Sequence, residues 1–447
     1  MGRGCAPPED AGQDAGEVRA CDARAFRSPP PYSPARRENG GAGVSEEETG
    51  ARFDVAVVGT GAAGLACALA LAGTGARVAL VGRHGPVPDG RTVALLDGSV
   101  RFLRALGAWA AIATDAAPLA TLRIVDDTGS LFRPPPAAFH AGEIGLDAFG
   151  WNVESTRLVG ALREAAGRAA GLTAFESDSV GMVPEETGAV LTLEDGRRLS
   201  ARLVVGADGA RSPLRAASGL RVREWSYDQG AVTTLLAHAR PHEDTSTEFH
   251  TRGGPFTLVP LPGGHRSSLV WVCARPEAER LAALDDSDLA EAVERRAHGM
   301  LGGMRIDGPR GLVPMRGLSV SSSVGNRLVL IGEAAHVFPP IGAQGLNLGL
   351  RDAAALRDTL AYALREGRDP GGRETLAGFA RGRRLDAGLR TAAVDLLNRS
   401  LFADFLPVDA LRGAGLVALS AIGPLRRAVM REGVLPRLGA PELMRAG

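Results

Sequence analysis

The sequence predicts an α/β protein built on a Rossmann-like nucleotide-binding domain. Two glycine-rich turns carry this prediction, because each follows a short run of β-branched residues and leads into a helical pattern. The first turn is Gly59–Gly64 and the second begins at Gly332. Between them, residues 222–320 contain short β-like runs, which predict a second domain built on a sheet.

Residues 1–50 form a compositional block of their own. They include the run Pro29–Pro31, glycines at 40, 41 and 43, and the acidic run Glu46–Glu48, and they show no hydrophobic periodicity. Such a segment buries too little apolar surface to fold alone, so we expect a disordered N-terminal tail. Its many acids and its lack of an apolar core region also argue against a transit or signal peptide.

Whole-chain composition argues against several function classes. Basic and acidic residues number 51 each, so net charge provides no attraction to nucleic acid. The four cysteines form no CxxC pair, and the eight histidines show no metal-ligand spacing. We therefore expect a cytoplasmic protein with no nucleic-acid partner and no metal.

The first turn reads Gly59-Thr60-Gly61-Ala62-Ala63-Gly64, which is a GxGxxG motif between a strand and a helix. In this motif the first glycine permits the tight turn, the second lets backbone approach a pyrophosphate, and the third lets helix and strand pack closely. The helix that follows offers free N–H groups and its positive dipole end to phosphates. These residues predict dinucleotide binding.

The motif lies inside Val55–Ala76, a stretch without charges that is long enough to span a bilayer. Its five glycines favour a buried strand, turn and helix over a membrane span. The next strand, Arg77–Val81, ends in Gly82-Arg83, where an acid normally binds the adenosine ribose. An arginine there is compatible with a 2′-phosphate, so the residues alone leave NAD(P) and FAD both open.

Hydrophobic periodicity predicts the elements that follow. The predicted helices cover residues 99–113, 156–170, 286–298 and 346–364. The predicted strands cover residues 190–193, 203–205, 256–259, 268–272 and 328–331.

Two later motifs resemble those of the single-component flavin aromatic hydroxylases, the group that includes p-hydroxybenzoate hydroxylase. Gly206–Ser212 is similar to their "DG" motif. Gly332–His336, followed by Pro339-Pro340 and Gly342–Asn347, is similar to their "GD" motif and flavin loop. With the first turn, the three motifs stand in the order and spacing of that family.

A narrower resemblance is to the ubiquinone-biosynthesis hydroxylases of the UbiH/UbiF type. It rests on Asp89–Leu96, on Leu106–Trp109, on Glu143–Gly145 with Phe149–Asn152, and on the tail around Asp395–Leu416, and it covers residues 53–436. The resemblance implies a p-hydroxybenzoate hydroxylase-like fold: a Rossmann-like FAD-binding domain, a β-sheet substrate domain and C-terminal helices. The corresponding FAD-binding segments are 51–125, 151–221 and 321–370, the substrate segments are 126–150 and 222–320, and the helical region is 371–447.

The resemblance also implies which residues bind FAD. They are Gly59, Gly61, Ala62, Ala63 and Gly64 at the pyrophosphate, Arg91 at the phosphate or ribityl region, Asp208 and Gly209 near the nicotinamide approach, Gly332 and Glu333 at the ribityl chain, and Pro340, Gly342, Gly345, Leu346 and Asn347 beside the flavin ring. Two positions depart from the family pattern, since Glu333 replaces an aspartate and Gly82 replaces the ribose-binding acid. An aspartate before a glycine is also a common turn residue, which is the alternative interpretation of Asp208.

The implied reaction is aromatic hydroxylation, with NADH or NADPH as reductant and O2 as co-substrate. No catalytic side chain is assigned, because the chemistry belongs to the flavin beside the loop Pro340 to Asn347. The implied substrate is a polyprenylated phenol, for which we expect Trp151, Asn152, Phe256 and Trp271 to form part of an apolar wall. The apolar stretch Leu411–Ile422, followed by Arg426-Arg427, suits contact with the inner membrane surface or a multi-enzyme complex, or packing on the FAD-binding domain.

Three other functions fit part of this pattern. An aromatic hydroxylase or epoxidase of secondary metabolism would use the same motifs. An NAD(P)-linked dehydrogenase would explain the first turn but not the later two. A flavin-binding, non-catalytic member of a quinone-synthesis assembly would be consistent with the departures at Gly82 and Glu333.

Overall fold

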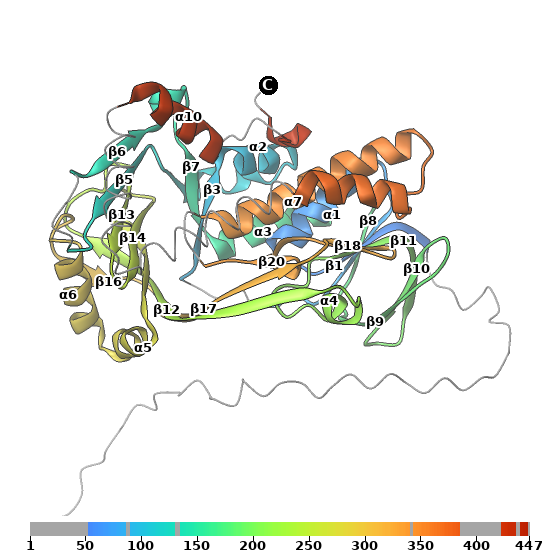
Figure 1. Cartoon of the computed structure of the whole chain (residues 1–447), viewed down its shortest axis with the longest axis horizontal. Helices are drawn as coiled ribbons and strands as arrows, with labels where there is room; N and C mark the ends of the chain where they lie inside the picture. Colours follow the sequence, from blue (N-terminus) through green and yellow to red (C-terminus); the bar gives the residue numbers. More distant parts are fainter. Residues whose placement is uncertain are drawn as a thin grey trace, which may run out of the picture. The chain divides into compact units, whose positions relative to one another are not determined.

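The computed structural model of the chain describes residues 52–85, 90–129, 135–339, 343–384, 422–434 and 439–445. All of them belong to one compact unit, Glu46–Gly447. The expected N-terminal tail lies outside the described residues. Within them the chain forms two large sheets and one small sheet (Figure 1).

The first large sheet contains the nucleotide-binding turn. Its central path is β18–β19–β11–β1–β2–β8, and β10 and β9 extend it from β11. The bounds are β1 Arg52–Val58, β2 Val78–Val81, β8 Leu172–Phe175, β9 Ser179–Pro184, β10 Ala189–Leu193, β11 Arg198–Gly206, β18 Val324–Gly325 and β19 Leu328–Leu330. Strands β1, β2, β8, β11 and β19 run parallel, as a Rossmann-like sheet requires.

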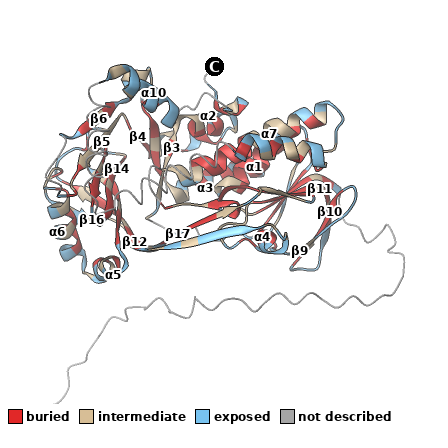
Figure 2. Cartoon of the chain, in the orientation of Figure 1, coloured by how far each residue is buried: buried red, intermediate tan, exposed pale blue. Residues whose placement is uncertain are grey.

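Three helices pack together on this sheet (Figure 1). They are α1 Ala62–Ala72, α3 Ser155–Arg168 and α7 Gln344–Arg365. Helix α1 is buried along almost all of its length, which explains why its sequence is nearly all alanine and leucine. Side chains of the three helices and of strands β1, β2, β11 and β19 form the largest apolar core. Figure 2 colours most of α1 as buried.

The second large sheet follows the order β20–β17–β12–β15–β14–β13–β5–β6, with β16 beside β12. The bounds are β5 Thr121–Asp126, β6 Ala137–His140, β12 Val222–His238, β13 Thr245–Thr251, β14 Gly254–Leu261, β15 Arg266–Ala274, β16 Met304–Ile306, β17 Gly311–Val320 and β20 His336–Val337. Helices α5, Arg275–Ala283, and α6, Asp286–Arg296, cover one of its faces. Helix α10, Gly423–Val434, packs near β6, on the other face.

A small sheet of β3 Thr92–Leu96, β7 Gly150–Glu154 and β4 Ala116–Pro118 lies between the two large ones. Helix α2, Asp97–Ala105, follows β3 in the chain.

The second glycine-rich turn also joins the two large sheets. Strand β19 before it belongs to the first sheet, and β20 after it pairs with β17 of the second sheet. This motif therefore stands at the junction of the two domains.

Most predicted elements are confirmed, including the β10–β11 hairpin and the long helix α7. The helix predicted at 99–113 is shorter, because α2 ends at Ala105 and Gly107 follows with φ +69°. The first half of β12 was not among the predicted strands, and most of its residues are exposed. Since β5 pairs in the second sheet, we place the first domain boundary near residue 120 rather than 125.

Candidate active site

The first turn has the geometry that a phosphate site needs. Gly59 has φ +121°, and a Cβ on it would lie 2.2 Å from the carbonyl oxygen of Ala207. A Cβ on Gly64 would lie 2.0 Å from the carbonyl oxygen of Gly59. Gly61 differs, since no described atom lies within 4 Å of its Cβ position, and no side chain caps the N-terminus of α1. Gly61 therefore borders open space into which the first N–H groups of α1 can donate.

The end of β2, where the ribose-binding acid is missing, is held by other contacts. Gly82 has φ +144° and packs on Thr60, whose hydroxyl donates to the carbonyl oxygen of Arg83 at 2.7 Å. The Arg83 guanidinium forms ion pairs with Glu194 and, at 3.8 Å, with Asp178. These two carboxylates would compete with a 2′-phosphate for Arg83, so the structure does not favour the NADP interpretation of this residue.

The second motif lies directly against the first turn. Asp208 follows Ala207, whose carbonyl group faces Gly59, and its Oδ2 accepts the N–H of Leu214 at 3.2 Å. Burial raises the pKa of Asp208, although hydrogen bonds oppose the shift. Asp208 therefore has a structural role at the start of α4, Pro213–Ala217, in addition to its place beside the nucleotide turn.

Arg215 connects the second motif to the third and was not identified from the sequence. Its side chain is 7% exposed and donates to the carbonyl oxygens of Ala334 at 3.0 Å and Ala210 at 2.7 Å. Both acceptors are backbone carbonyl groups, which every residue has. The residue types at these two positions therefore do not indicate the contact with Arg215. The one available signal is the position of Arg215 directly after a motif in a short helix.

The third motif packs tightly between two helices. Gly332 has φ +57°, and a Cβ on it would lie 3.3 Å from the Cβ of Ala63 on α1. A Cβ on Gly349 of α7 would lie 3.1 Å from the Cα of Gly332. The neighbouring Glu333 is exposed, and within the described residues no ion pair is formed by its carboxylate. Glu333 is therefore available to a ligand hydroxyl.

A buried carboxylate lies behind this turn. Oδ2 of Asp352 accepts the N–H of Gly332 at 3.0 Å and Nε2–H of His336 at 2.7 Å, and Oδ1 accepts Nε–H of Arg383 at 2.7 Å. Burial alone would raise the pKa of Asp352, but the charges of Arg383 and His336 outweigh it and lower the pKa to about 2. His336 is thus occupied by a structural contact. Asp352 lies among the apolar positions of a predicted helix, where an acid is expected only if it is paired. This position could have indicated the buried carboxylate from the sequence.

The N-terminus of α7 is held by Asn347. Its Nδ2 donates to the carbonyl oxygens of Ala94 at 2.8 Å and Ala343 at 2.6 Å, and its Oδ1 accepts the N–H of Leu96 at 2.9 Å. The Asn347 side chain therefore fastens β3 to α7, which leaves backbone groups to face a cofactor. Pro340 and Gly342 lie outside the described residues.

The other expected residues of this region differ in their surroundings. Gly345 is exposed with no neighbour near its Cβ position, while Leu346 is partly buried against the main core. Arg91, at the start of β3, is exposed and its carbonyl oxygen accepts the N–H of Ser155 at 2.8 Å. Gly209 adopts φ +80° in the second motif.

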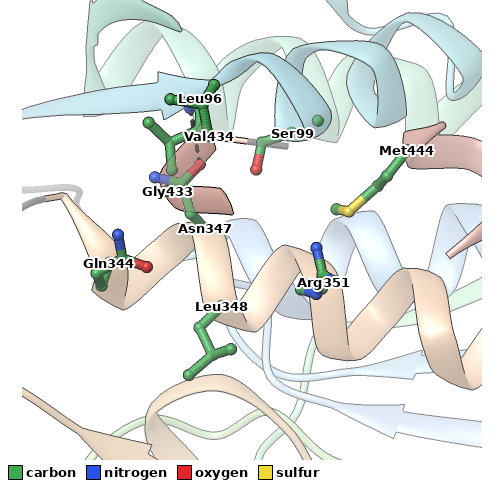
Figure 3. Close-up of a pocket in the computed structure, with 10 residues that line it drawn as sticks. Leu96, Ser99, Gln344, Asn347, Leu348, Arg351, Gly433, Val434 and Met444 are labelled. Carbon is green, nitrogen blue, oxygen red and sulfur yellow. Dashed lines mark hydrogen bonds between the residues drawn. The ribbon is translucent and has the colours of Figure 1, made fainter. Parts of the chain in front are cut away.

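A small cavity borders the first turns of α7 (Figure 3). Its volume is about 30 Å³, which is room for a water molecule but not for a flavin or a substrate. Its lining includes Leu96, Ser99, Asn347, Arg351 and Met444, and Figure 3 shows the Asn347–Leu96 hydrogen bond at its edge. This cavity belongs to the packing of α2 on α7.

Asn152 joins the small sheet to the second large sheet. It is 1% exposed, and its Nδ2 donates to the carbonyl oxygen of Pro260 at 2.8 Å and to Oγ of Ser268 at 3.3 Å. The hydroxyl of Thr92 on β3 donates to the same Oγ at 2.8 Å. Trp151 instead packs edge-on against Trp109, with ring centroids 5.9 Å apart, at the main core.

The positions of Phe256 and Trp271 correct one expectation. Their rings are 5.2 Å apart and belong to the core between the sheet and helices α5 and α6. Because side chains alternate along β15, Trp271 faces the side opposite to Ser268, which contacts the small sheet. Neither aromatic residue therefore lies on the face that meets the FAD-binding domain.

That face carries a different apolar cluster. Its buried members are Ala231, Val272 and Met315, and partly buried Tyr227, Val270 and Val313 pack against them. The sequence did not identify this cluster because β12, β15 and β17 have apolar residues on both faces, so alternation does not tell which face meets the cofactor domain.

The described residues include no membrane-spanning helix and no cluster suited to a metal ion. No helix among them is long and apolar enough to cross a bilayer. Three or more His, Cys, Asp or Glu side chains arranged to bind a metal ion were likewise not found in this part of the chain.

Comparison with known proteins agrees with the geometry. The model of the family described as "FAD binding domain" matches residues 52–379. Ubiquinone hydroxylase UbiL of Rhodospirillum rubrum is 35% identical, over 88% of this chain and 92% of that protein. The 3-demethoxyubiquinol 3-hydroxylase of Escherichia coli is 28% identical, over 85% of this chain and 97% of that protein.

Solved structures show the same fold. PqsL of P. aeruginosa, in complex with 2-aminobenzoylacetate, superposes with a TM-score of 0.67 at 26% identity. The match covers 82% of this chain and 100% of that chain. These similarities confirm the predicted fold class, with its FAD-binding and sheet domains, and the resemblance on which it rested.

Proposed function

This chain belongs to the FAD-binding family whose model matches residues 52–379, and from that premise we propose that it is an FAD-dependent monooxygenase of ubiquinone biosynthesis. It hydroxylates an aromatic ring of a polyprenylated phenol, with NADH or NADPH as reductant and O2 as co-substrate. The observation that carries the proposal is the convergence of three motifs on one site, in a chain that is 35% identical to a ubiquinone hydroxylase over most of its length.

The described residues fit FAD. When bound, FAD supplies the electron transfer and oxygen activation that no side chain can perform. The N–H groups at the start of α1 bind the pyrophosphate, because Gly61 leaves the approach open. Glu333, exposed at the third motif, accepts hydrogen bonds from the ribityl hydroxyls. The N-terminus of α7 stabilises negative charge at the edge of the flavin ring through its dipole.

The second sheet provides the substrate wall. Its face toward the FAD-binding domain carries the apolar cluster of Ala231, Val272 and Met315, with Val270 and Val313 beside it. Such a wall excludes water from the reacting groups and accepts an apolar ring and its prenyl tail. Asn152 on β7 and Thr92 on β3 both donate to Ser268, which fixes the spacing between this wall and the small sheet.

A lipid-soluble substrate also requires a route to the site. Within the described residues, α10 exposes an apolar strip of Leu425 and Val429, with Ile422 just before it. These positions are spaced by three and four residues and so share one face of the helix. We propose that this face contacts the inner membrane or a partner in a multi-enzyme complex, and that the protein is otherwise cytoplasmic.

Two measurements test this function. Purified protein is expected to show flavin absorption and to release FAD on denaturation, and its NADH or NADPH oxidation should rise when a polyprenylated phenol is added. A deletion strain should accumulate a polyprenylphenol that lacks one ring hydroxyl, which also names the ring position.

The alternatives give other results. Bound FAD with an unchanged quinone pool and turnover on other aromatic substrates would indicate a hydroxylase of secondary metabolism. Bound FAD without substrate-stimulated oxidation of NADH or NADPH would indicate a non-catalytic assembly member. A protein that cannot be reconstituted with FAD would contradict the proposal altogether.

A further inference from the structure

Asp352 connects three segments of the chain at one buried point. It lies on α7 and is 4% exposed. Its carboxylate accepts hydrogen bonds from the backbone of Gly332 at 3.0 Å, from His336 at 2.7 Å and from Arg383 at 2.7 Å. The first two partners belong to the third motif, and the third comes from a helix at residues 373–384. A single side chain thus links that helix to the turn that carries Glu333.

Arg383 is the cation that makes this arrangement stable. Arg383 is 5% exposed, and its Nη2 lies 2.6 Å from Oδ1 of Asp352. Its Nε–H donates a hydrogen bond to the same oxygen. A buried carboxylate without a cation would be costly, so removing Arg383 leaves Asp352 in an unfavourable state. Arg383 lies beyond the family match, which ends at residue 379, so no motif of the FAD site includes it.

Two side chains of α7 hold described residues of the third motif and of the first turn of α7. Asp352 holds Gly332 and His336, and Asn347 holds Ala343 together with the edge of β3. The described residues of this region, 332–339 and 343–347, include Glu333. Their position therefore depends on two side chains of α7, one of which depends in turn on Arg383.

We propose that Asp352 and Arg383 are positioning residues for FAD, and that FAD binding is coupled to the packing of the helix at residues 373–384. The inference rests on the proposed function, since it takes FAD to be the ligand of the third motif. The coupling is reciprocal: if the helix stabilises the turn that binds FAD, then bound FAD stabilises the helix by the same free energy.

The test uses the full chain as apoprotein, titrated with FAD by flavin fluorescence. The variants are D352N, R383M and the double variant D352N/R383M, and R384M is the control because Arg384 is the exposed neighbour of Arg383. We expect D352N and R383M to raise the Kd of FAD at least tenfold and R384M to change it less than twofold. Thermal melting of each apoprotein shows the temperature range in which it is folded.

Two further readouts separate positioning from a general contribution to folding. The double variant removes both members of the Asp352–Arg383 ion pair together, so its apoprotein should melt closer to wild type than either single variant, while its Kd for FAD stays at least tenfold raised. In hydrogen-exchange mass spectrometry, FAD should slow amide exchange at residues 373–384 of the wild type and of R384M, but not of R383M.

The outcomes are distinct. Single variants that melt lower but bind FAD with the wild-type Kd while folded would overturn the inference, and so would a double variant that regains both stability and affinity. Exchange at residues 373–384 that is indifferent to FAD in the wild type would overturn the coupling. Wild-type protein that binds no FAD would instead refute the proposed function, which is the reason for titrating it first.

Discussion

Two glycines of the first turn should separate folding from FAD binding when each is replaced by alanine. Gly61 and Gly64 are three residues apart in the chain, but a Cβ would be crowded at Gly64 and unobstructed at Gly61. A methyl group on Gly64 would lie 2.0 Å from the carbonyl oxygen of Gly59, whereas a methyl group on Gly61 would meet no described atom within 4 Å. Gly61 also has φ −75°, which alanine adopts without strain.

The expected magnitudes follow from these contacts. Gly64→Ala forces backbone apart in a packed core, which costs roughly 1–3 kcal/mol or more of the free energy of unfolding. Gly61→Ala should change that free energy by less than about 0.5 kcal/mol. Its methyl group instead occupies the phosphate approach, and the loss of one hydrogen bond to a charged group, worth about 1.5–3 kcal/mol, raises the Kd of FAD about 10- to 150-fold.

The assay measures both quantities on the same samples. Chemical denaturation of the apoprotein gives the free energy of unfolding, and fluorescence titration gives the Kd of FAD. The expected pattern is a folded Gly61→Ala with weak FAD binding and a destabilised Gly64→Ala. A Gly61→Ala protein that binds FAD as the wild type does would refute the placement of the pyrophosphate at this turn.

Other predictions concern the sheet domain, the buried carboxylate and the two buried thiols. Phe256→Ala should lower the free energy of unfolding by about 3–5 kcal/mol with little effect on KM for the phenol, because the Phe256 ring faces α5 and α6. Val270→Ala should instead raise that KM at a smaller cost in stability. If Phe256→Ala raised KM and Val270→Ala did not, Phe256 would belong to the substrate wall. Because the pKa of Asp352 is lowered from 3.8 to about 2, its carboxylate contributes about 2 kcal/mol to the free energy of unfolding. This contribution is complete above the unfolded pKa and is lost as the pH falls from 3.8 to about 2. Acid denaturation of D352N should lack this component, and an unchanged curve would contradict the assignment. Burial raises the pKa of the thiols of Cys67 and Cys273, the latter to about 11, so both should resist iodoacetamide at pH 8 until the protein unfolds, as mass spectrometry can measure.

Much of the nucleotide site was predictable because its requirements are local. Gly59 adopts φ +121° and Gly64 accepts a carbonyl group at contact distance, so glycine is the residue that fits at both positions of this turn. The elements on either side follow from the change in hydrophobic period from strand to helix. The same reasoning located the turn at Gly332 and the long helix α7 after it.

The face that we propose as the substrate wall could not be predicted from the sequence. Strands β14 and β15 are apolar on both faces, since α5 and α6 cover one face and the FAD-binding domain lies against the other. Large aromatic residues such as Phe256 and Trp271 then mark the core and not the site. The choice between faces is made by the packing of the two domains, which depends on contacts such as Asn152 with Pro260.

The sequence by itself determined the fold class, the nucleotide turn and the resemblance to flavin hydroxylases, because each depends on residues that are near one another in the chain. Only the tertiary structure decided which groups surround the third motif. Arg215 reaches Ala334, and Arg383 reaches Asp352 on another helix. Such pairs form where helices and turns from distant parts of the chain meet in the core. Neither periodicity nor spacing in the sequence predicts these pairs, because the residues come together only once the sheets and helices have packed.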